Sequence, residues 1–235
     1  DRGLLRLEAG RGRPEVLVDP VDGRPLRYAS NAVMGVDGTI YFTVSSQRYT
    51  IDRWRSDIIE HSGTGRLLRL DPDGAVTVLR DDLQFANGLV LAPDESFVLV
   101  AETGASRIAR YWLAGEQAGE SDVFIYDLPG YPDNMSIGSD GLVWCALASP
   151  RNNLLEGVFK LPPRARYVLA KVPERIGPAP ADAVWVLGID FDGNVVHDIR
   201  PEDIDYTFVT SVAERDGVLY FGTIVDNALG VYQLG

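Results

Sequence analysis

The sequence predicts an all-β fold made of repeated antiparallel units, and three observations support this. Short apolar runs rich in Val, Ile, Leu, Tyr and Phe recur along the 235 residues, and Gly, Asp or Pro bounds most of them. The runs fall into groups of four, joined by turns such as Asp37-Gly38 and Asp73-Gly74, whose residues accept positive φ between paired strands. The groups open alike, with an Asn or Asp, an apolar run, a turn and a second apolar run: SNAVMGVDGTIYFTVSS, ANGLVLAPDESFVLVAET and PDNMSIGSDGLVWCALA. Repeats of about 40 to 50 residues, each a four-stranded meander, are typical of a β-propeller.

The order of these runs predicts each unit in turn. Two short strands, at 3–7 and 15–18, surround a Gly-Arg turn and form half a unit. The first complete unit has expected strands at 33–36, 39–44, 66–70 and 75–79. The loop 47–65 inside this unit is long and mixed in charge, and we expect a short helical turn over 52–61.

The remaining units repeat the plan with one interruption. The second complete unit has expected strands at 89–91, 97–101, 107–113 and 122–126. The third has expected strands at 135–137, 142–146, 184–189 and 195–199. The segment 151–182, rich in Pro and basic residues, interrupts the third unit as an insertion. The last unit has three expected strands, at 209–212, 218–222 and 230–234.

The alternative to a propeller is a β-sandwich, which also gives many short strands with regular turns. The propeller is favoured because the polar opening recurs in the first strand of the units and not in the others, and first strands line one axis in a propeller. Half a blade, three blades and three further strands predict a six-bladed β-propeller lacking about one and a half N-terminal blades, which we expect upstream of Asp1. A closed four-bladed ring is the weaker alternative. Residues 1–235 are therefore expected to form a single propeller domain, incomplete at the N-terminus, with an insertion at 151–182.

Composition and charge exclude several kinds of protein. With 46% hydrophobic residues the chain can bury a large core. A net charge of −12 argues against a nucleic-acid-binding surface, which needs clustered Lys and Arg, and is compatible with a cation site. The single cysteine, Cys145, excludes an internal disulfide and a Cys-rich zinc site, and its apolar surroundings predict a buried side chain. No apolar run is long enough to span a bilayer and no signal peptide opens the chain, so the compartment stays open.

The insertion 151–182 combines apolar and basic residues on an otherwise acidic chain. Its apolar stretches are flanked by Lys160, Arg164, Arg166, Lys171 and Arg175. We expect an ordinary packed insertion; a lid over the propeller axis and a membrane-facing patch are less favoured alternatives. Of the two histidines, His197 is expected on the surface of an outer strand, and a proton-transfer role for His61 is a minor alternative.

The polar openings of the units are the candidate functional residues. Asn31, Asn87, Asp133 and Asn134 stand at the starts of three predicted inner strands, which converge on the axis of a propeller. Taken singly, Asn before Gly is a common turn residue, and Asp after Pro is a common loop residue. Their recurrence at one position of the unit favours a shared polar or metal-binding axis. Carboxylate and amide oxygens are the ligands of a hard cation such as Ca²⁺.

Three stretches carry a resemblance to a known family. FANGLVLAPD with VLVAET, GYPDNMSI (130–137) and ERDGVLYFGT (214–223) resemble the strictosidine synthase-like branch of the six-bladed calcium-dependent phosphotriesterase superfamily. That superfamily also includes gluconolactonases, paraoxonases, diisopropyl fluorophosphatase and adipocyte plasma membrane-associated proteins. The resemblance covers nearly the whole chain and is weakest over 151–182.

The resemblance implies a calcium-dependent lactonase or arylesterase. In the hydrolytic relatives Ca²⁺ or another divalent cation is held at the positions matching Asn31, Asn87, Asp133 and Asn134, with a Glu from a first blade that we expect upstream. Such a cation polarises an ester or lactone carbonyl while an Asp or a bound water attacks, so Asp133 is also the catalytic candidate. The candidates for substrate contact are Tyr41, Phe85, Tyr131 and Thr210.

Two departures from the family pattern leave alternatives open. The hydrolases usually carry Asp after the first Asn, where this chain has Ala32. Strictosidine synthases condense an amine with an aldehyde using a Glu where this chain has Thr210, and Thr cannot serve as that acid/base group. Condensation is therefore less favoured than hydrolysis, and a non-catalytic propeller that binds a small ligand or a partner is the main alternative.

Overall fold

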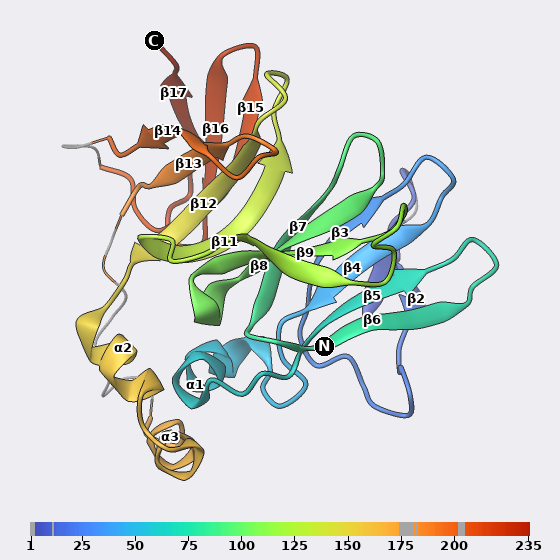
Figure 1. Cartoon of the computed structure of the whole chain (residues 1–235), viewed down its shortest axis with the longest axis horizontal. Helices are drawn as coiled ribbons and strands as arrows, with labels where there is room; N and C mark the ends of the chain where they lie inside the picture. Colours follow the sequence, from blue (N-terminus) through green and yellow to red (C-terminus); the bar gives the residue numbers. More distant parts are fainter. Residues whose placement is uncertain (1–2, 11, 174–180, 182, 202–204) are drawn as a thin grey trace. The chain divides into compact units, whose positions relative to one another are not determined.

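The computed structural model describes residues 3–10, 12–173, 181, 183–201 and 205–235 (Figure 1). The chain divides into two compact units. The first consists of the described residues up to 87 together with 157–173, and the second of 88–156 together with the described residues from 181 onward.

The first unit contains a two-stranded and a four-stranded antiparallel sheet. β1 (Leu4–Arg6) pairs with β2 (Glu15–Val18), as the sequence predicted. The larger sheet consists, in order, of β3 (Ala29–Met34), β4 (Ile40–Val44), β5 (Gly65–Leu70) and β6 (Val76–Leu83). Apolar side chains from β2, the loop after it and the larger sheet form one core: Val18, Val21, Leu26, Phe42, Val44, Leu68 and Leu70.

Helices of the first unit occupy the β4–β5 loop and the insertion. η1 (Ile51–Arg53) and α1 (Trp54–Glu60) fill the span where the sequence predicted a helical turn, which confirms that prediction. α1 ends at His61, whose left-handed φ of 53° is typical of a helix terminus. In the insertion α2 (Asn153–Phe159) leads into α3 (Pro163–Leu169), which starts on Pro because the first helical N–H needs no partner within the helix. None of the helices in the described part of the chain is long and apolar enough to cross a membrane.

The insertion packs against α1 within the first unit. α3 packs on α1, and the Arg53 guanidinium donates to the carbonyl of Ala170 at 3.1 Å. The rings of His61 and Phe159 lie 4.5 Å apart. Both ends of α1 therefore have a contact in the insertion.

The second unit contains three antiparallel sheets. The first consists, in order, of β7 (Ala86–Leu91), β8 (Phe97–Glu102), β9 (Arg107–Trp112) and β10 (Ser121–Ile125), with η2 (Thr103–Ala105) between β8 and β9. The second consists of β11 (Gly130–Ile137), β12 (Val143–Pro150), β13 (Val186–Ile189) and β14 (Val195–Ile199). The third consists of β15 (Val209–Arg215), β16 (Val218–Thr223) and β17 (Gly230–Gln233).

Two hydrophobic cores hold these three sheets together. The core between the first and second sheets includes Leu99, Ile108, Cys145, Leu147 and Leu187. The core between the second and third sheets includes Trp144, Val186, Val209 and Leu219. Cys145 is fully buried, which confirms the prediction from its apolar surroundings, and burial raises the pKa of its thiol far above the usual range. Each sheet thus packs face to face on the next, as the blades of a propeller do.

The predicted strands are present, and each four-stranded sheet is the meander predicted for a propeller blade. The insertion separates β12 from β13, yet these strands pair directly, with Cys145 opposite Leu187. Three inner strands begin earlier than predicted, at Ala29, Ala86 and Gly130. The reason is that their polar residues lie inside the strands and interrupt the apolar pattern on which the prediction depends.

His197 lies in the outer strand β14, where the sequence predicted it. Its ring is partly buried rather than fully at the surface, because it stacks on Trp144 with 5.4 Å between centroids and 18° between planes. Gly188 on the intervening strand β13 makes room for this stack, since a Cβ there would lie 3.1 Å from the Trp144 ring and 3.2 Å from His197.

A buried hydrogen-bond network connects α1 to the loop after β4. The carboxylate of Asp57, 1% exposed, accepts from Ser46 Oγ at 2.5 Å and from Ser62 Oγ at 2.9 Å. Glu60 accepts from the Tyr49 hydroxyl at 2.5 Å. Burial raises the pKa of Asp57 to about 6; the two serine hydroxyls oppose that rise and the Glu60 charge adds to it.

The raised pKa of Asp57 predicts that the free energy of unfolding falls as pH rises from 3.8 to about 6. The folded state holds the Asp57 proton up to about pH 6, whereas an unperturbed carboxyl releases it near 3.8, so the unfolded state gains a relative advantage between those values. The difference between these two pKa values lowers the free energy of unfolding by roughly 3 kcal/mol above pH 6. Urea unfolding at a series of pH values should show the free energy of unfolding of the parent protein falling by this amount relative to that of Asp57→Asn, because carboxyls with a lowered pKa, such as Asp94 and Asp190, are common to both proteins. Asp81→Asn, on an exposed part of β6, is the matched control and should keep the decline; an unchanged decline in Asp57→Asn would contradict the prediction.

Candidate functional site

Asn31, Asp133, Asn134 and Thr210 lie at β-bulges. In β11 Pro132 pairs with Leu147 of β12, and Met135 pairs with Cys145. Two residues, Asp133 and Asn134, therefore lie opposite the single residue between Cys145 and Leu147. The same irregularity occurs at two other predicted positions, Ser30-Asn31 in β3 and Thr210 in β15. A bulge bends its strand and aims a side chain in a direction that strict alternation would not allow. Bulges are common next to binding and catalytic sites for that reason.

In the first unit one hydroxyl group joins Asn31 to Asn87. Thr43 of β4 is fully buried, and its Oγ1 accepts from the backbone N–H of Asn31 at 3.2 Å and donates to the backbone carbonyl of Asn87 at 2.6 Å. Ser30 Oγ donates to Asn87 Oδ1 at 3.2 Å. Asn87 is 7% exposed. Two of the four predicted ligands are therefore brought together.

In the second unit the other two predicted ligands are joined to Thr210. Asn134 Nδ2 donates to Asp133 Oδ1 at 3.1 Å and to the carbonyl of Thr210 at 2.9 Å. Ser136 and Val212 each lie two residues further along these strands, and Ser136 Oγ donates to the carbonyl of Val212 at 2.7 Å. These bonds fix the orientation of the Asn134 amide and hold β11 beside β15.

The backbone of β7 approaches the backbone of β11 very closely at Gly88. A Cβ on Gly88 would lie 2.6 Å from each of three backbone atoms: Asp133 O, Asn134 Cα and Met135 N. Only Gly permits this approach. Thr103 Oγ1 adds a hydrogen bond of 2.6 Å to the carbonyl of Pro132, directly before Asp133.

Two aromatic residues precede axial positions in a strained backbone conformation. Phe85, two residues before Asn87, has φ of 57°, and Phe208, two residues before Thr210, has φ of 52°. Left-handed geometry costs a bulky residue roughly 1 to 3 kcal/mol, and such residues collect at functional sites. The shared position indicates that Thr210 occupies in its sheet the place that Asn87 occupies in β7.

The four predicted substrate contacts have different surroundings. Phe85 is buried with its ring 5.5 Å from Tyr28, edge to face. The Tyr131 hydroxyl donates to Glu156 Oε1 and accepts from the N–H of Asn152, both at 3.1 Å, and burial raises its pKa to about 12. The side chain of Tyr131 is thus tied to the start of α2. Tyr41 is partly buried in β4, opposite Val33, and Thr210 is brought to Asn134.

The donor set of the predicted site fits a hard cation. Three Asn side-chain carbonyls and one Asp carboxylate offer only oxygen, the donor that Ca²⁺ prefers. With one negative charge among four ligands the set suits weak binding, because affinity rises with ligand charge. In the described ranges of the chain there is no group of three or more His, Cys, Asp or Glu that could hold a metal.

Sequence reasoning missed the residues that position this set. Ser30, Thr43 and Thr103 hold the backbone or side chains of the predicted ligands or their neighbours. Thr43 interrupts the apolar run IYFTV, and this polar residue inside a predicted core strand was the available signal. The bulges had no signal in a single sequence.

Comparison with known proteins assigns the chain to a family. The model of the strictosidine synthase family matches residues 31–116. Strictosidine synthase-like protein 10 of Arabidopsis thaliana is 32% identical over 243 residues, which cover 99% of this chain and 64% of that protein. Strictosidine synthase-like protein 7 of the same plant is 33% identical over 201 residues, covering 83% of this chain and 52% of that protein.

The chain belongs to the strictosidine synthase-like family. Adipocyte plasma membrane-associated protein of Rattus norvegicus is also similar, with 34% identity over 235 residues that cover 94% of this chain and 62% of that protein. The strictosidine synthase-like chain thus spans 52% to 64% of the length of these three relatives.

Solved structures show the fold of this strictosidine synthase-like chain. A gluconolactonase from Xanthomonas campestris matches with a TM-score of 0.64 at 18% identity, covering 100% of this chain and 66% of that one. Regucalcin, a calcium-binding protein from Agrobacterium tumefaciens, matches with a TM-score of 0.60 at 16% identity, covering 97% of this chain and 64% of that one. The all-β propeller predicted from the repeats is confirmed.

Proposed function

We propose that this chain carries the site of a metal-dependent hydrolase of lactones or esters, with a divalent cation held by Asn31, Asn87, Asp133 and Asn134. The proposal rests on one observation: the four proposed ligands form two pairs, each connected by hydrogen bonds. Asn31 and Asn87 share the hydroxyl of Thr43, and Asp133 and Asn134 share a hydrogen bond in the bulge of β11. Within the second unit, the backbone of Gly88 lies against that of Asp133 and Asn134.

The protein groups have separate roles in this proposal. When bound, the cation would supply a positive charge that favours the oxyanion developing on an ester or lactone carbonyl. Asp133 would hold a proton of the attacking water, since it is the only carboxylate of the set and the Asn134 amide orients it at 3.1 Å. Thr43 would position Asn31 and Asn87 without touching the substrate.

The choice of substrate and cation has support from two structural relatives. One is named a gluconolactonase and the other a calcium-binding protein, and both have the fold of this chain. Their identity to it is below one fifth, so substrate class and cation remain part of the proposal.

The experiment compares the purified protein in millimolar calcium with the same protein in excess chelator. We expect calcium to raise the melting temperature, because a ligand that binds only the folded state stabilises it. Hydrolysis of γ-lactones or phenyl acetate should appear with calcium and disappear with chelator. A protein that gains neither stability nor turnover with calcium, manganese or magnesium would overturn the proposal.

A propeller that binds a small ligand without catalysis is the second candidate. Two observations favour it: Ala32 replaces the acidic neighbour of the first Asn, and the Tyr131 hydroxyl is already engaged by Glu156 and Asn152. It would be supported by a calcium-dependent rise in melting temperature without any turnover.

A further inference from the structure

The surface around α3 differs in charge from the rest of the chain. Residues 157–173 contain four basic residues and no Asp or Glu, although the whole chain has a net charge of −12. The four are Lys160, Arg164, Arg166 and Lys171. Arg175, which the sequence placed with them, lies outside the described residues. We call residues 160–172, with Arg48 and Arg53 beside them, the basic–apolar patch.

Apolar side chains on the same segment face solvent. Leu161, Tyr167, Val168, Leu169 and Val172 are each between 36% and 63% exposed. Single exposed apolar residues are ordinary, but five within twelve residues of chain form a cluster of the kind that marks an interaction surface.

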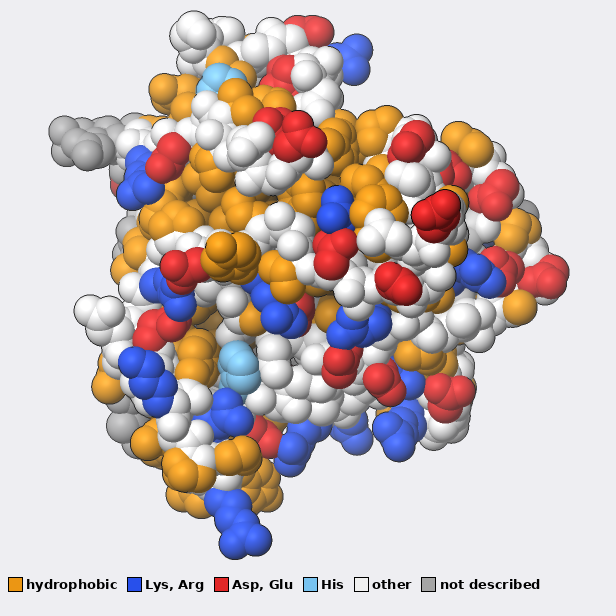
Figure 2. All heavy atoms as spheres, in the orientation of Figure 1, with side chains coloured by type: hydrophobic (Ala, Val, Ile, Leu, Met, Phe, Trp, Pro, Cys, Tyr) orange, Lys and Arg blue, Asp and Glu red, His pale blue; other side chains and the backbone are white. Residues whose placement is uncertain are grey.

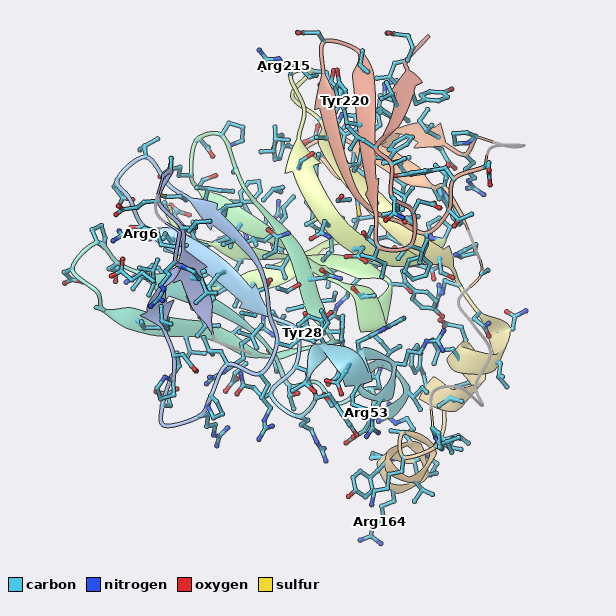
Figure 3. The ribbon with its side chains drawn as sticks, turned by 180° about the vertical axis from the view of Figure 1, so that it is seen from behind. Arg6, Tyr28, Arg53, Arg164, Arg215 and Tyr220 are labelled. Atoms are coloured by element: carbon cyan, nitrogen blue, oxygen red, sulfur yellow. The ribbon has the colours of Figure 1, made fainter. Side chains whose placement is uncertain are left out.

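α3 itself has no buried residue, and Ala165 and Arg166 are its partly buried positions. Ala170 is fully buried at the helix end and accepts the hydrogen bond from Arg53. Arg164 and Val168 are four residues apart in α3 and so lie on one face, and Lys171 follows the end of the helix; all three are exposed. Figure 3 shows Arg164 extending from α3 on the side away from Arg53. Figure 2 shows Lys and Arg side chains lying among hydrophobic ones over α3.

Acidic groups of the neighbouring elements neutralise one cation of the patch, Arg48. Asp57 and Glu60 of α1 are buried. Glu60 forms an ion pair with Arg48, and Asp52 of η1 is exposed and accepts from Thr50 at 2.5 Å. Lys171 lies over the Tyr167 ring at 4.1 Å, so a cation and an apolar ring are presented together.

We propose that the basic–apolar patch docks on the surface of a membrane that contains anionic lipids. Its cations would pair with lipid phosphates and carboxylates, while Leu161, Val168 and Val172 would enter the boundary of the acyl chains. An acidic protein would match the cations but would leave this apolar cluster without a partner, and a second copy of the acidic chain would do the same. A mixed surface of this type suits a lipid interface, where both kinds of side chain find a matching environment.

The test is co-sedimentation of the purified protein with phosphatidylcholine vesicles, with and without phosphatidylserine. We expect binding that requires phosphatidylserine and weakens as salt is added, because surface charges are screened. The triple variant Lys160→Gln/Arg164→Gln/Lys171→Gln should bind about a hundredfold less. Leu161→Gln/Val168→Gln should also bind less, although its charge is unchanged.

The matched control is Arg13→Gln/Arg24→Gln/Arg215→Gln, which removes the same charge from exposed positions outside the patch and should keep its vesicle binding. Melting temperatures of all variants show whether each is folded. Three outcomes would overturn the proposal: no binding of the parent protein to phosphatidylserine vesicles, an equal loss in patch and control variants, or binding to soluble polyglutamate without binding to vesicles. A concentration-dependent dimer that the triple variant loses, without vesicle binding, would assign the patch to a second copy instead.

Discussion

Replacing Asp133 by Asn is expected to abolish the calcium response and to lower lactone or ester hydrolysis by roughly two to three orders of magnitude. The physical reason is charge. Asp133 is the only carboxylate among the four proposed ligands, and Asn at this position would leave four neutral amides to face a divalent cation. Asn has the same shape and can still accept the hydrogen bond from Asn134, so the fold should be retained. The measurements are initial rates in calcium and the melting temperature with and without chelator.

The control is Asp192→Asn, which removes the same charge from an exposed turn between β13 and β14. It should keep both the turnover and the calcium response. Normal hydrolysis in Asp133→Asn would contradict the role of Asp133, whereas loss of the calcium response with normal folding would support it. If both variants lose activity, the effect comes from net charge and not from the site.

Gly88→Ala is expected to destabilise the protein by roughly 3 kcal/mol or more. Its Cβ would lie 2.6 Å from Asp133 O, Asn134 Cα and Met135 N, all of them backbone atoms that cannot turn away as a side chain could. Relief requires β7 and β11 to separate, which would disturb the bulge that holds Asp133 and Asn134. Urea unfolding with a fitted free energy measures the loss.

Gly157→Ala is the matched control. Gly157 lies within α2 and has open space around its Cα, so Ala should raise stability by roughly 0.5 to 1 kcal/mol through its better helix propensity. Opposite signs for the two substitutions are therefore expected. Equal small effects would contradict the close approach of β7 and β11 at Gly88.

The strands and the blade pattern could be predicted because each depends on short stretches of sequence. Apolar runs bounded by Asp-Gly turns predicted hairpins, and the repetition of four such runs predicted the meander sheets. The helical turn at α1 was predicted as well, whereas α2 and α3 in the insertion were not. The side chain of Cys145 was predicted as buried from its neighbours alone, and it is.

The starts of the inner strands could not be predicted in the same way. A bulge depends on how many residues face each other across two strands, as at Pro132 and Met135, and this pairing is not a property of either stretch alone. The hydrogen bond from Thr43 to the Asn87 carbonyl joins residues 44 positions apart, beyond any local pattern. The recurrence of Asn and Asp predicted which residues are candidates for the site, and the structure adds how their backbones are held.

The hydrogen bonds that hold the inner strands affect which of their residues can change during evolution of the family. Thr43 donates to the main-chain carbonyl of Asn87, Thr103 to that of Pro132, and Asn134 to that of Thr210. Every amino acid carries such a carbonyl, so the side chain at Asn87 or Thr210 can be exchanged while the acceptor that anchors the strand remains. Single substitutions at Asn87 or Thr210 can therefore change the chemistry there and keep these hydrogen bonds, whereas a substitution of Asn134 removes one of them.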